Sequence, residues 1–381
     1  MLLGLAVWIV VPPPAPLLLY LAIAVPELSP WLLLLSLLVA GIAAMDFRTH
    51  RSARVALVLA ASTMSLAAIP LLQFASAARQ ADTAMTAALG QRFWDEVPQA
   101  ARARVRPQPL SVRELLFGLR PGPVRIARGV SLQSGAGERL ALVVYRPERT
   151  GTYPVLVQIY GGAWQHGAPA DNALLARELA RSGLVVFAVD HRHAPSWRWP
   201  AQLEDIRLAL RWVQLHASEY GGDATRTALL GRSSGAQLAM LAAYSGNAGV
   251  RAVVNYYGPV DLTEGYRRPP TPDPLNIRGI LEALLGGPPQ RAAEAYRSAS
   301  AISYLSHRVP PTLSIYGRRD YVVEPRFGSL LDARLHAAGD TSVLLQIPWA
   351  GHAFDAIPNG LGAQLALYHT ERFLAWALAR R

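Results

Sequence analysis

The chain has 381 residues, of which 51% are hydrophobic and only 17% are charged, and its formal net charge at pH 7 is +11. This length suits one large domain with an accessory segment. Because the sequence contains no cysteine, it excludes disulfides, thiol catalysis and cysteine-ligated metals. The basic surplus is accompanied by no nucleic-acid-binding motif and no stripe of basic and aromatic residues, so nucleic acid is not expected as a partner.

The excess of apolar residues is concentrated in residues 1–75, which contain only five charged side chains. Three apolar blocks can be distinguished there, at about 2–25, 30–45 and 55–74, and each is close to the roughly 20 residues that a membrane helix needs. We therefore expect about three transmembrane helices. No basic side chain precedes Arg48, so cleavage of a signal peptide is not expected.

The distribution of charge predicts the orientation of these helices. The connection between the second and third blocks carries Arg48, Arg51 and Arg54, whereas the connection around Glu27 carries no basic residue. By the positive-inside rule, the arginine loop is cytoplasmic. The rest of the chain is then expected on the extracytoplasmic side, in a multi-pass protein of the cell membrane.

Residues 76–128 are rich in arginine and proline, with nine arginines and four acidic residues. Next to a membrane, such a segment suits anionic lipid headgroups, and a solvated basic linker explains the composition equally well. Its first part, near 77–93, has the pattern of an amphipathic helix, and the prolines after it indicate an irregular connector. The sequence leaves open whether this segment is a linker or a lid over a functional site.

From residue 129 onward, short apolar runs alternate with helical patterns. The predicted strands are 129–133, 139–145, 154–160, 184–189, 227–230, 251–255, 312–316 and 342–347, and the predicted helices are 171–181, 200–220, 236–244, 325–338 and 361–379. This alternation predicts an α/β fold for 129–381, with a mostly parallel, eight-stranded sheet flanked by helices and ligands at the carboxyl ends of its strands. A proline-rich insertion at 263–306 is expected to cap that end.

The stretch Gly231-Arg-Ser-Ser-Gly235 joins the apolar run 228–230 directly to an Ala/Leu-rich helical pattern. A strand, a tight turn and a helix in immediate succession are the setting of a nucleophile elbow. Such a turn forces its middle residue, Ser233, into strained backbone angles, and the small residues on either side let the two backbones approach. Ser233 is therefore the predicted nucleophile.

A serine hydroxyl needs a base to take its proton, and the base needs a carboxylate to orient it. His352 lies in a loop after the last predicted strand, and Asp320 follows the strand before it. The order Ser233, Asp320, His352, with each residue just beyond a strand end, is the order found in enzymes with this elbow. Asp261, after the sixth strand, is the reserve acid, with the capping of a turn as its alternative role.

A serine nucleophile that attacks a carbonyl group also needs N–H donors for the negative charge that develops on oxygen. The third strand ends at Gly161-Gly162, a turn whose backbone can face the site. Together with the amide of Ser234, this turn supplies the predicted donors. An ordinary tight turn is the alternative reading of the two glycines.

Polar residues also follow the fourth predicted strand. Asp190, Arg192 and the later Asp205 are expected to form a buried ion-pair network that supports the glycine turn. His191 and His193 have the spacing of two metal ligands, but no further ligand cluster accompanies them. Neither a metal nor a cofactor is therefore expected.

Residues 129–381 resemble the α/β-hydrolases of the hormone-sensitive-lipase-like and kynurenine-formamidase-like esterase group. The resemblance rests on Tyr160-Gly-Gly-Ala-Trp164, Asp190-His-Arg-His-Ala-Pro195, Trp199-Pro-Ala-Gln-Leu-Glu-Asp205, the Ser233 elbow, Gly317-Arg-Arg-Asp-Tyr-Val322 and Gly351-His352. It implies Ser233 as nucleophile, His352 as base and Asp320 as the residue that orients the base. It also implies oxyanion donors among Gly161, Gly162, Ala163 and Ser234. Tyr160 stands where the group has a histidine.

This resemblance implies that a serine hydrolyses an ester or a related acyl bond. The expected function is that of a membrane-anchored serine hydrolase that cleaves carboxylic esters, small or lipid-like, through an acyl-enzyme. An amide or aryl-formamide hydrolase is the alternative among enzymes. A non-catalytic binding module on the same fold is the alternative outside them.

Overall fold

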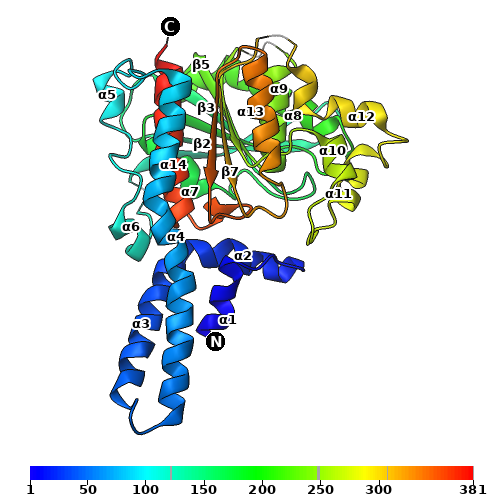
Figure 1. The fold of residues 1–381 in the computed structure, drawn as a ribbon. Coiled ribbons are helices and arrows are strands. Elements are labelled where there is room, and N and C mark those ends of the chain that lie inside the picture. Colours follow the sequence, from blue (N-terminus) through cyan, green and yellow to red (C-terminus); the bar gives the residue numbers. More distant parts are fainter. Residues whose placement is uncertain (121, 247–248, 307, 381) are drawn as a thin grey trace.

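The computed structural model describes residues 1–120, 122–246, 249–306 and 308–380. An eight-stranded sheet with the order β1-β2-β4-β3-β5-β6-β7-β8 forms its core (Figure 1). The strands are β1 (Val124–Gln133), β2 (Arg139–Pro147), β3 (Tyr153–Ile159), β4 (Val185–Val189), β5 (Gly222–Arg232), β6 (Val250–Tyr256), β7 (Thr312–Gly317) and β8 (Ser342–Ile347). The pairs β1–β2 and β2–β4 are antiparallel and the other pairs are parallel, which confirms the predicted sheet. The expected domain range, 129–381, includes residues 247–248, 307 and 381, which lie outside the described residues.

Helices cover both faces of the sheet. One face carries α7 (Ala173–Arg181) and α14 (Leu361–Ala379), and the other carries α8 (Ala201–His216), α9 (Ser234–Tyr244) and α13 (Arg326–Ala337) (Figure 1). Strands between two helical layers have no solvent-facing side, so their side chains are apolar almost throughout. Every residue of β4 and of β7 is buried. This packing fixes the strand ends, and with them the turns that carry the candidate residues.

The N-terminal block differs from the expected set of about three transmembrane helices. It forms α1 (Leu2–Ala6), the 3-10 helix η1 (Val7–Ile9), α2 (Pro16–Glu27), α3 (Ser29–Met45) and the first part of α4 (Arg51–Leu89). Within the described residues, only α4 is long and apolar enough to cross a membrane by itself. α2 and α3 pass the same test only as one span with a bend of 78°. The expectation of a first membrane helix at 2–25 is therefore wrong.

Proline explains why the first apolar block is broken. Pro12, Pro13 and Pro14 lack a backbone N–H and have a fixed φ, so a regular helix does not run through them. The helix after them, α2, has 12 residues and is about 18 Å long at roughly 1.5 Å per residue. That length is well short of the bilayer's hydrocarbon core, which is about 30 Å thick.

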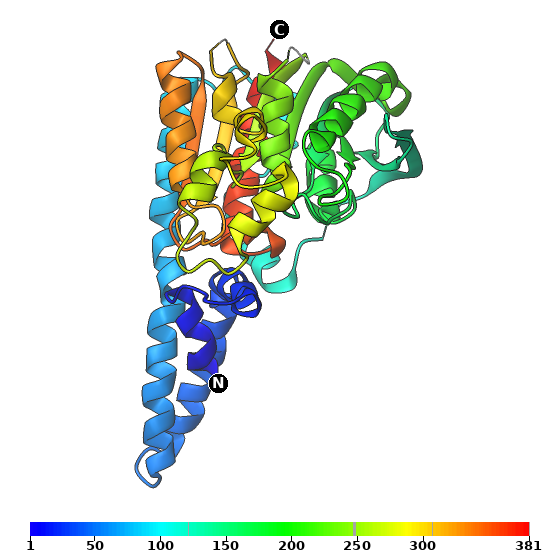
Figure 2. The ribbon, with the colours of Figure 1, turned by 90° about the vertical axis from the view of Figure 1, so that its right-hand side faces the viewer.

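α4 runs from the N-terminal block into the sheet domain without a break. Its first part pairs with α3 in a hairpin that projects from the domain and has residues 46–50 at its tip (Figure 2). Its second part lies along β8 and α14 and buries Phe74 and Met85. The expected membrane helix at 55–74 and the expected amphipathic helix at 77–93 are thus parts of one helix.

The segment after α4 is attached to the domain by buried polar contacts. It contains α5 (Gln99–Arg102) and α6 (Val112–Phe117). The buried Arg106 pairs with Glu114 at 2.7 Å and with Glu178 at 3.4 Å. Its backbone N–H donates to the carboxylate of Glu371 in α14 at 2.7 Å. These contacts hold the segment beside α14.

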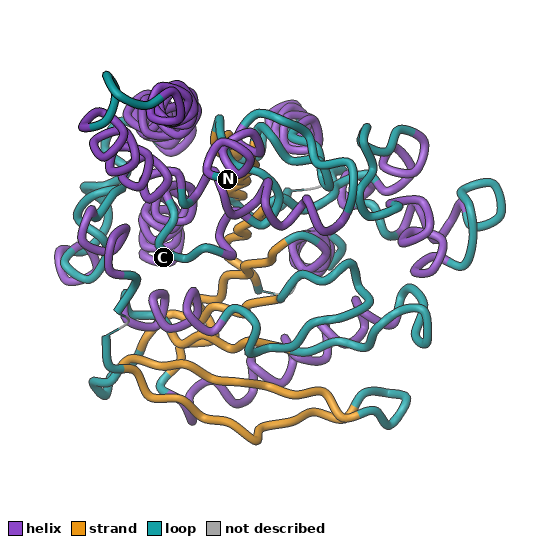
Figure 3. Tube along the Cα trace, turned by 90° about the horizontal axis from the view of Figure 1, so that it is seen from below, coloured by secondary structure: helices purple, strands orange, loops and turns teal. Residues whose placement is uncertain are grey.

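The insertion after β6 contributes α10 (Leu262–Arg267), α11 (Ile277–Leu285), α12 (Ala293–Ser298) and the 3-10 helix η3 (Ala301–Tyr304). Residues of α10 and α11 line the main pocket of the protein. In the view from the side of the hairpin, the N-terminus projects over the middle of the domain (Figure 3). The insertion and the N-terminal helices therefore both contribute to the end of the sheet at which the parallel strands finish.

Glu371 gives the domain a measurable pH dependence. Burial raises the pKa of its carboxyl from 4.5 to about 7, against the opposing effect of the Arg106 N–H. The stability that comes from the neutral carboxyl is fully present below pH 4.5 and is lost as the pH rises through about 7. We expect Glu371→Gln to remove this loss, which is about 3 to 4 kcal/mol at roughly 1.4 kcal/mol per pKa unit, and to flatten the dependence of Tm on pH. Glu294→Gln, at an exposed site, is the control and should keep the wild-type profile; an unchanged slope in Glu371→Gln would contradict this assignment.

Candidate active site

The predicted nucleophile turn lies between β5 and α9. Ser233 has φ +52° and ψ −123°, a conformation that residues other than glycine rarely adopt. Its N–H donates to the carbonyl oxygen of Tyr256 at 2.9 Å, which holds the turn against β6. A Cβ atom at Gly231 would lie 2.2 Å from the carbonyl oxygen of Gly235, and one at Gly235 would lie 2.1 Å from that of Tyr160. Glycine is therefore required at both positions, because the strand, the helix and the turn after β3 approach too closely for a side chain.

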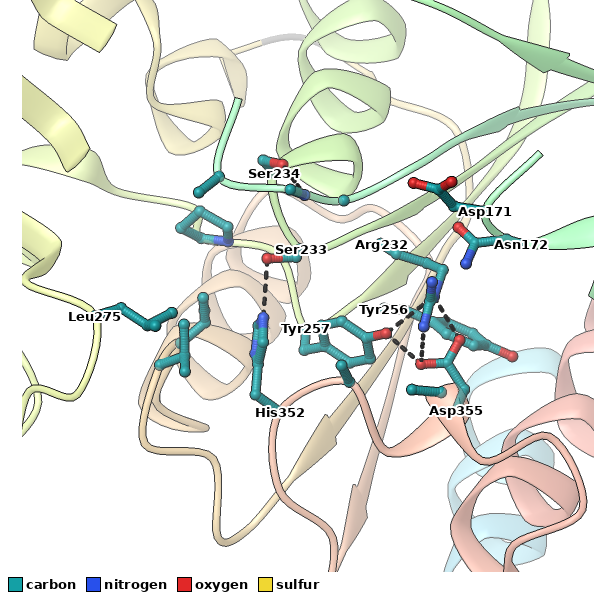
Figure 4. A pocket seen from close by; sticks show the side chains of 18 of the residues that line it. Asp171, Asn172, Arg232, Ser233, Ser234, Tyr256, Tyr257, Leu275, His352 and Asp355 are labelled. Carbon is teal, nitrogen blue, oxygen red and sulfur yellow. Dashed lines mark hydrogen bonds and ion pairs between the residues drawn. The ribbon is translucent and has the colours of Figure 1, made fainter. Parts of the chain in front are cut away.

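Hydrogen bonds connect Ser233, His352 and Asp320. His352 Nε2 lies 2.9 Å from Ser233 Oγ (Figure 4), and His352 Nδ1 lies 2.8 Å from Asp320 Oδ2. Asp320 Oδ1 accepts the backbone N–H groups of Val322 and Val323, both at 2.8 Å, so the carboxylate is fixed in place. The structure thus brings the three predicted residues together in the geometry of a nucleophile, a base and an acid that orients the base.

The reserve acid, Asp261, bonds to the start of a helix, whereas Asp320 is the acid that bonds to His352. The side chain of Asp261 accepts the backbone N–H of Glu264 at 3.0 Å and caps the N-terminus of α10. This contact is the capping role that the sequence analysis gave as the alternative.

The turn after β3 lies directly against the nucleophile. Gly161, Gly162 and Ala163 line the same pocket as Ser233 and Ser234. A Cβ atom at Gly161 would lie 3.0 Å from the Cβ atom of Ser233, which shows how closely the two turns pack. The N–H of Gly162 donates to Ser234 Oγ at 3.1 Å (Figure 4). The four residues predicted as oxyanion donors therefore surround Ser233, and in this conformation the Gly162 amide is bonded to Ser234.

Tyr160, which directly precedes the glycine turn, is anchored through its hydroxyl group. The hydroxyl donates to Asp190 Oδ1 at 2.6 Å and lies 2.9 Å from His193 Nε2. The ring stacks on His191 with 4.7 Å between ring centroids. Burial, together with the charge of Asp190, raises the pKa of Tyr160 above its ordinary value, and burial lowers the pKa of His191 to about 4. At neutral pH, the tyrosine is thus a protonated donor beside a neutral imidazole.

The expected network of Asp190, Arg192 and Asp205 consists of two separate groups. Arg192 pairs with Asp205 at 2.8 Å, whereas Asp190 accepts the tyrosine hydroxyl described above. The loop that carries them is tied to the turn after β3, because the N–H of Ala194 donates to the carbonyl oxygen of Trp164 at 2.8 Å. Among the residues that the structure describes, no cluster of three or more metal-ligating side chains is found.

Sequence reasoning missed an ion pair beside His352. Arg232, in the nucleophile turn, pairs with Asp355 at 2.5 Å, and both side chains bond to the hydroxyl of Tyr257 (Figure 4). The ring of Tyr257 packs against the imidazole of His352 with 4.7 Å between ring centroids. The ion pair therefore holds the Tyr257 ring in place beside the imidazole of His352. The only signals in the sequence were an arginine inside the elbow motif and an acid three residues after the histidine.

A pocket of about 830 Å³ opens above Ser233, within the size range of small-molecule sites. Its lining is largely apolar and comes from several parts of the chain, among them α2, α7, α14, the insertion and the segment after β7. The apolar residues include Pro16 and Leu19 of α2, Leu174 and Leu175 of α7, Leu367 of α14, Leu262, Leu275, Ile277, Ile280 and Leu281 of the insertion, and Val322, Val323 and Phe327 after β7. The site can therefore bury a bulky apolar group next to a serine hydroxyl.

The chain is similar to known esterases over most of its length. A model of the family described as BD-FAE matches residues 142–335, about half of the chain. The probable carboxylic ester hydrolase LipM of Mycobacterium tuberculosis is 31% identical over 338 residues, with 82% of this chain and 76% of LipM covered. Esterase LipC of the same organism is 34% identical over 221 residues, which cover 54% of each chain. A solved structure of a Pyrobaculum calidifontis esterase matches with a TM-score of 0.59 and 25% identity, over 66% of this chain and 84% of that one.

These similarities agree with the motifs and the fold. The family match begins in β2 and ends in α13, so it contains both the nucleophile turn and Asp320. The similarity to LipM covers more than two thirds of both chains. The resemblance drawn from the motifs is therefore confirmed, and the chain belongs to the BD-FAE family, within the esterase group of the α/β-hydrolases.

Proposed function

We propose that this protein is a membrane-anchored serine hydrolase that cleaves carboxylic esters through an acyl-enzyme intermediate. The observation that carries the proposal is the hydrogen-bonded line from Asp320 through His352 to Ser233 beside an apolar pocket. The similarity to named ester hydrolases supports the class of reaction.

In the proposed first step, Ser233 Oγ attacks the carbonyl carbon of the ester while His352 Nε2 takes the hydroxyl proton. Asp320 accepts the Nδ1–H of His352, which keeps the imidazole in the reactive tautomer and stabilises the imidazolium that forms. The carbonyl oxygen becomes negatively charged as the carbon becomes tetrahedral. Groups that bond to this oxygen lower the barrier, by about 3 to 4 kcal/mol for each donor in well-studied cases.

We assign the binding of the oxyanion to backbone N–H groups among Gly161, Gly162, Ala163 and Ser234. Their position around Ser233 supports this assignment, as does the location of Ser234 at the N-terminus of α9, whose dipole favours negative charge. The bond between Gly162 and Ser234 Oγ would be exchanged for a bond to the oxyanion if the Gly162 amide takes part.

The tetrahedral intermediate then breaks its bond to the alcohol oxygen, which takes the proton from His352 Nε2 and leaves as the free alcohol. The acyl group remains on Ser233 Oγ as an ester. A water molecule attacks this ester while His352 takes one of its protons. Breakdown of the second intermediate returns that proton to Ser233 Oγ and releases the carboxylic acid.

The N-terminal helices support attachment to a membrane. α4 meets the length and hydropathy of a spanning helix, and the bent pair of α2 and α3 can supply a second crossing. The tip of the α3–α4 hairpin holds the arginine-rich loop, at the end far from the sheet domain (Figures 1 and 2). By the positive-inside rule, this arrangement favours a cytoplasmic tip and an extracytoplasmic catalytic domain.

Replacement of Ser233 by alanine tests the proposed mechanism. The variant lacks the attacking oxygen, so kcat for a p-nitrophenyl ester should fall by about 10³-fold or more while Tm stays the same. The full-length protein in detergent should be labelled by a fluorophosphonate probe, and Ser233→Ala should not. Ser182→Ala, at the end of α7, is the matched control and should retain both turnover and labelling.

Two outcomes would change the assignment. Turnover of the ester by Ser233→Ala at the wild-type rate would exclude the acyl-enzyme route. Faster turnover of a matched amide than of the ester would move the protein to the amide hydrolases.

Replacement of Tyr160 by phenylalanine tests whether its hydroxyl braces the oxyanion turn. The ring can keep its stacking on His191, but the bond to Asp190 is lost. We expect kcat/KM to fall about tenfold, equivalent to about 1.4 kcal/mol. Tyr153→Phe is the matched control, because it removes a hydroxyl bond to Arg149 at the opposite end of β3. Equal losses of kcat/KM in the two variants would contradict a specific role for Tyr160.

A further inference from the structure

Part of the active-site pocket is built by the N-terminal block. Pro16, Leu19 and Tyr20 of α2 line the pocket together with His352. Leu19 is 7% exposed and packs in the main apolar core of the domain. By contrast, Leu17 on the same helix is 77% exposed and is not among the residues that line the pocket. One face of α2 thus belongs to the site, and the other faces outward.

The N-terminal segment contacts the loops that carry Asp320 and His352, the acid and the base of the catalytic triad with Ser233. Arg319, beside the triad acid, donates a hydrogen bond to the carbonyl oxygen of Val10. A Cβ atom at Gly351, beside the triad base, would lie 3.5 Å from the carbonyl oxygen of Ala22. At the end of α2, Glu27 accepts a backbone N–H from the start of α14 at 2.6 Å. α2 is therefore a fixed part of the site's surroundings.

The outer surfaces of the three helices are apolar. Large exposed apolar side chains include Leu17 and Tyr20 on α2, Leu34, Leu37, Leu38 and Ile42 on α3, and Val55, Val58 and Leu72 on α4. No formal charge occurs between residues 55 and 72, the exposed stretch of α4 before the buried Phe74, which is about 27 Å long. An exposed apolar surface of this extent matches the hydrocarbon core of a bilayer.

This apolar surface ends at the level of the active site. Leu72 is 79% exposed, whereas Phe74 is buried, with 5.9 Å between the centroids of its ring and that of Trp349. Trp349 comes three residues before His352 in the loop that follows β8. In Figures 1 and 2, α2 lies between the hairpin and the sheet domain, next to the end at which the parallel strands finish. The surface that suits lipid therefore reaches the loop that holds the base.

We infer that α2 lies at the membrane surface as the rim of the pocket, and that the substrate is an ester of a long acyl chain taken laterally from the bilayer. This inference rests on the proposed ester hydrolase function. The acyl chain moves from lipid past Leu19 into the apolar pocket, so it remains in apolar surroundings and its hydrocarbon is not exposed to water. The ester group then lies at Ser233, near the polar boundary of the membrane.

Lateral uptake is tested with the full-length protein in phospholipid vesicles. The probe is 4-methylumbelliferyl palmitate, supplied either in the vesicles that contain the enzyme or in separate vesicles. We expect an initial rate at least about tenfold higher when enzyme and ester share a membrane, because the local concentration of the ester at α2 is then higher. Equal initial rates in the two arrangements would overturn the inference.

The role of α2 is tested by enlarging its buried face. Leu19→Trp narrows the path into the pocket, and Leu17→Trp adds the same bulk on the exposed face as the control. We expect Leu19→Trp to lower the ratio of palmitate hydrolysis to acetate hydrolysis at least about tenfold relative to wild type. Leu17→Trp should leave both rates unchanged. Fluorophosphonate labelling identifies folded protein, and Leu19→Phe, a smaller enlargement, replaces Leu19→Trp if the latter is not labelled.

The two esters separate failure of this inference from failure of the proposed function. Hydrolysis of acetate that depends on Ser233, with palmitate hydrolysis absent or insensitive to Leu19, would overturn the inference and leave the hydrolase assignment intact. Absence of hydrolysis of both esters, or equal hydrolysis by Ser233→Ala, would overturn the proposed function itself.

Discussion

The close approach of three backbone segments at Ser233 is the constraint on which the rest of the site depends. The strand order places β3 beside β5, so the turn after β3 meets the turn between β5 and α9. At Gly235, a single added carbon would lie 2.1 Å from a carbonyl oxygen of the neighbouring turn. The positive φ of Ser233 costs on the order of 1 to 3 kcal/mol. The surrounding structure offsets this cost, because every residue of α9 is buried.

The same approach explains why polar support is concentrated behind the turn after β3. A backbone that must stay within contact distance of Ser233 cannot be fixed by large side chains at its glycines. The support comes instead from Tyr160 at the strand end and from the loop after β4, through Asp190 and Ala194. Burial keeps the tyrosine hydroxyl protonated, so a phenol acts as the hydrogen-bond donor behind the glycine turn.

The sequence was most informative where a residue type has few alternatives. The glycines on either side of Ser233, and the order of Ser233, Asp320 and His352 after successive strands, predicted turns that the structure brings together. The central strands, such as β3, β4 and β7, were found because strands covered on both faces are short, apolar runs. The start of β2, in contrast, alternates between exposed and buried residues. The partnership of Arg232 and Asp355 could not be predicted, because 123 residues separate them and neither lies in a pattern that requires the other.

Hydropathy alone misjudged the N-terminal block, for two physical reasons. It sums apolar residues across Pro12, Pro13 and Pro14, although a helix cannot continue through them. It also cannot distinguish lipid-facing residues from those that pack on a protein core. Leu72 and Phe74 are both apolar, yet the first is exposed and the second is buried against the sheet domain.

The continuity of α4 joins the hairpin directly to the sheet domain. A helix of 39 residues, about 58 Å long, carries the chain from the arginine loop to the edge of the sheet and continues through Pro70. Within such a helix, each added residue turns everything beyond it by about 100° and raises it by about 1.5 Å. One residue inserted near Leu72 would therefore turn the pocket away from α2 by about 100°, while it would move the pocket along the helix axis by only about 1.5 Å. The number of residues in α4 thus sets the rotation of the sheet domain about the helix axis. This rotation determines the direction in which the active site faces.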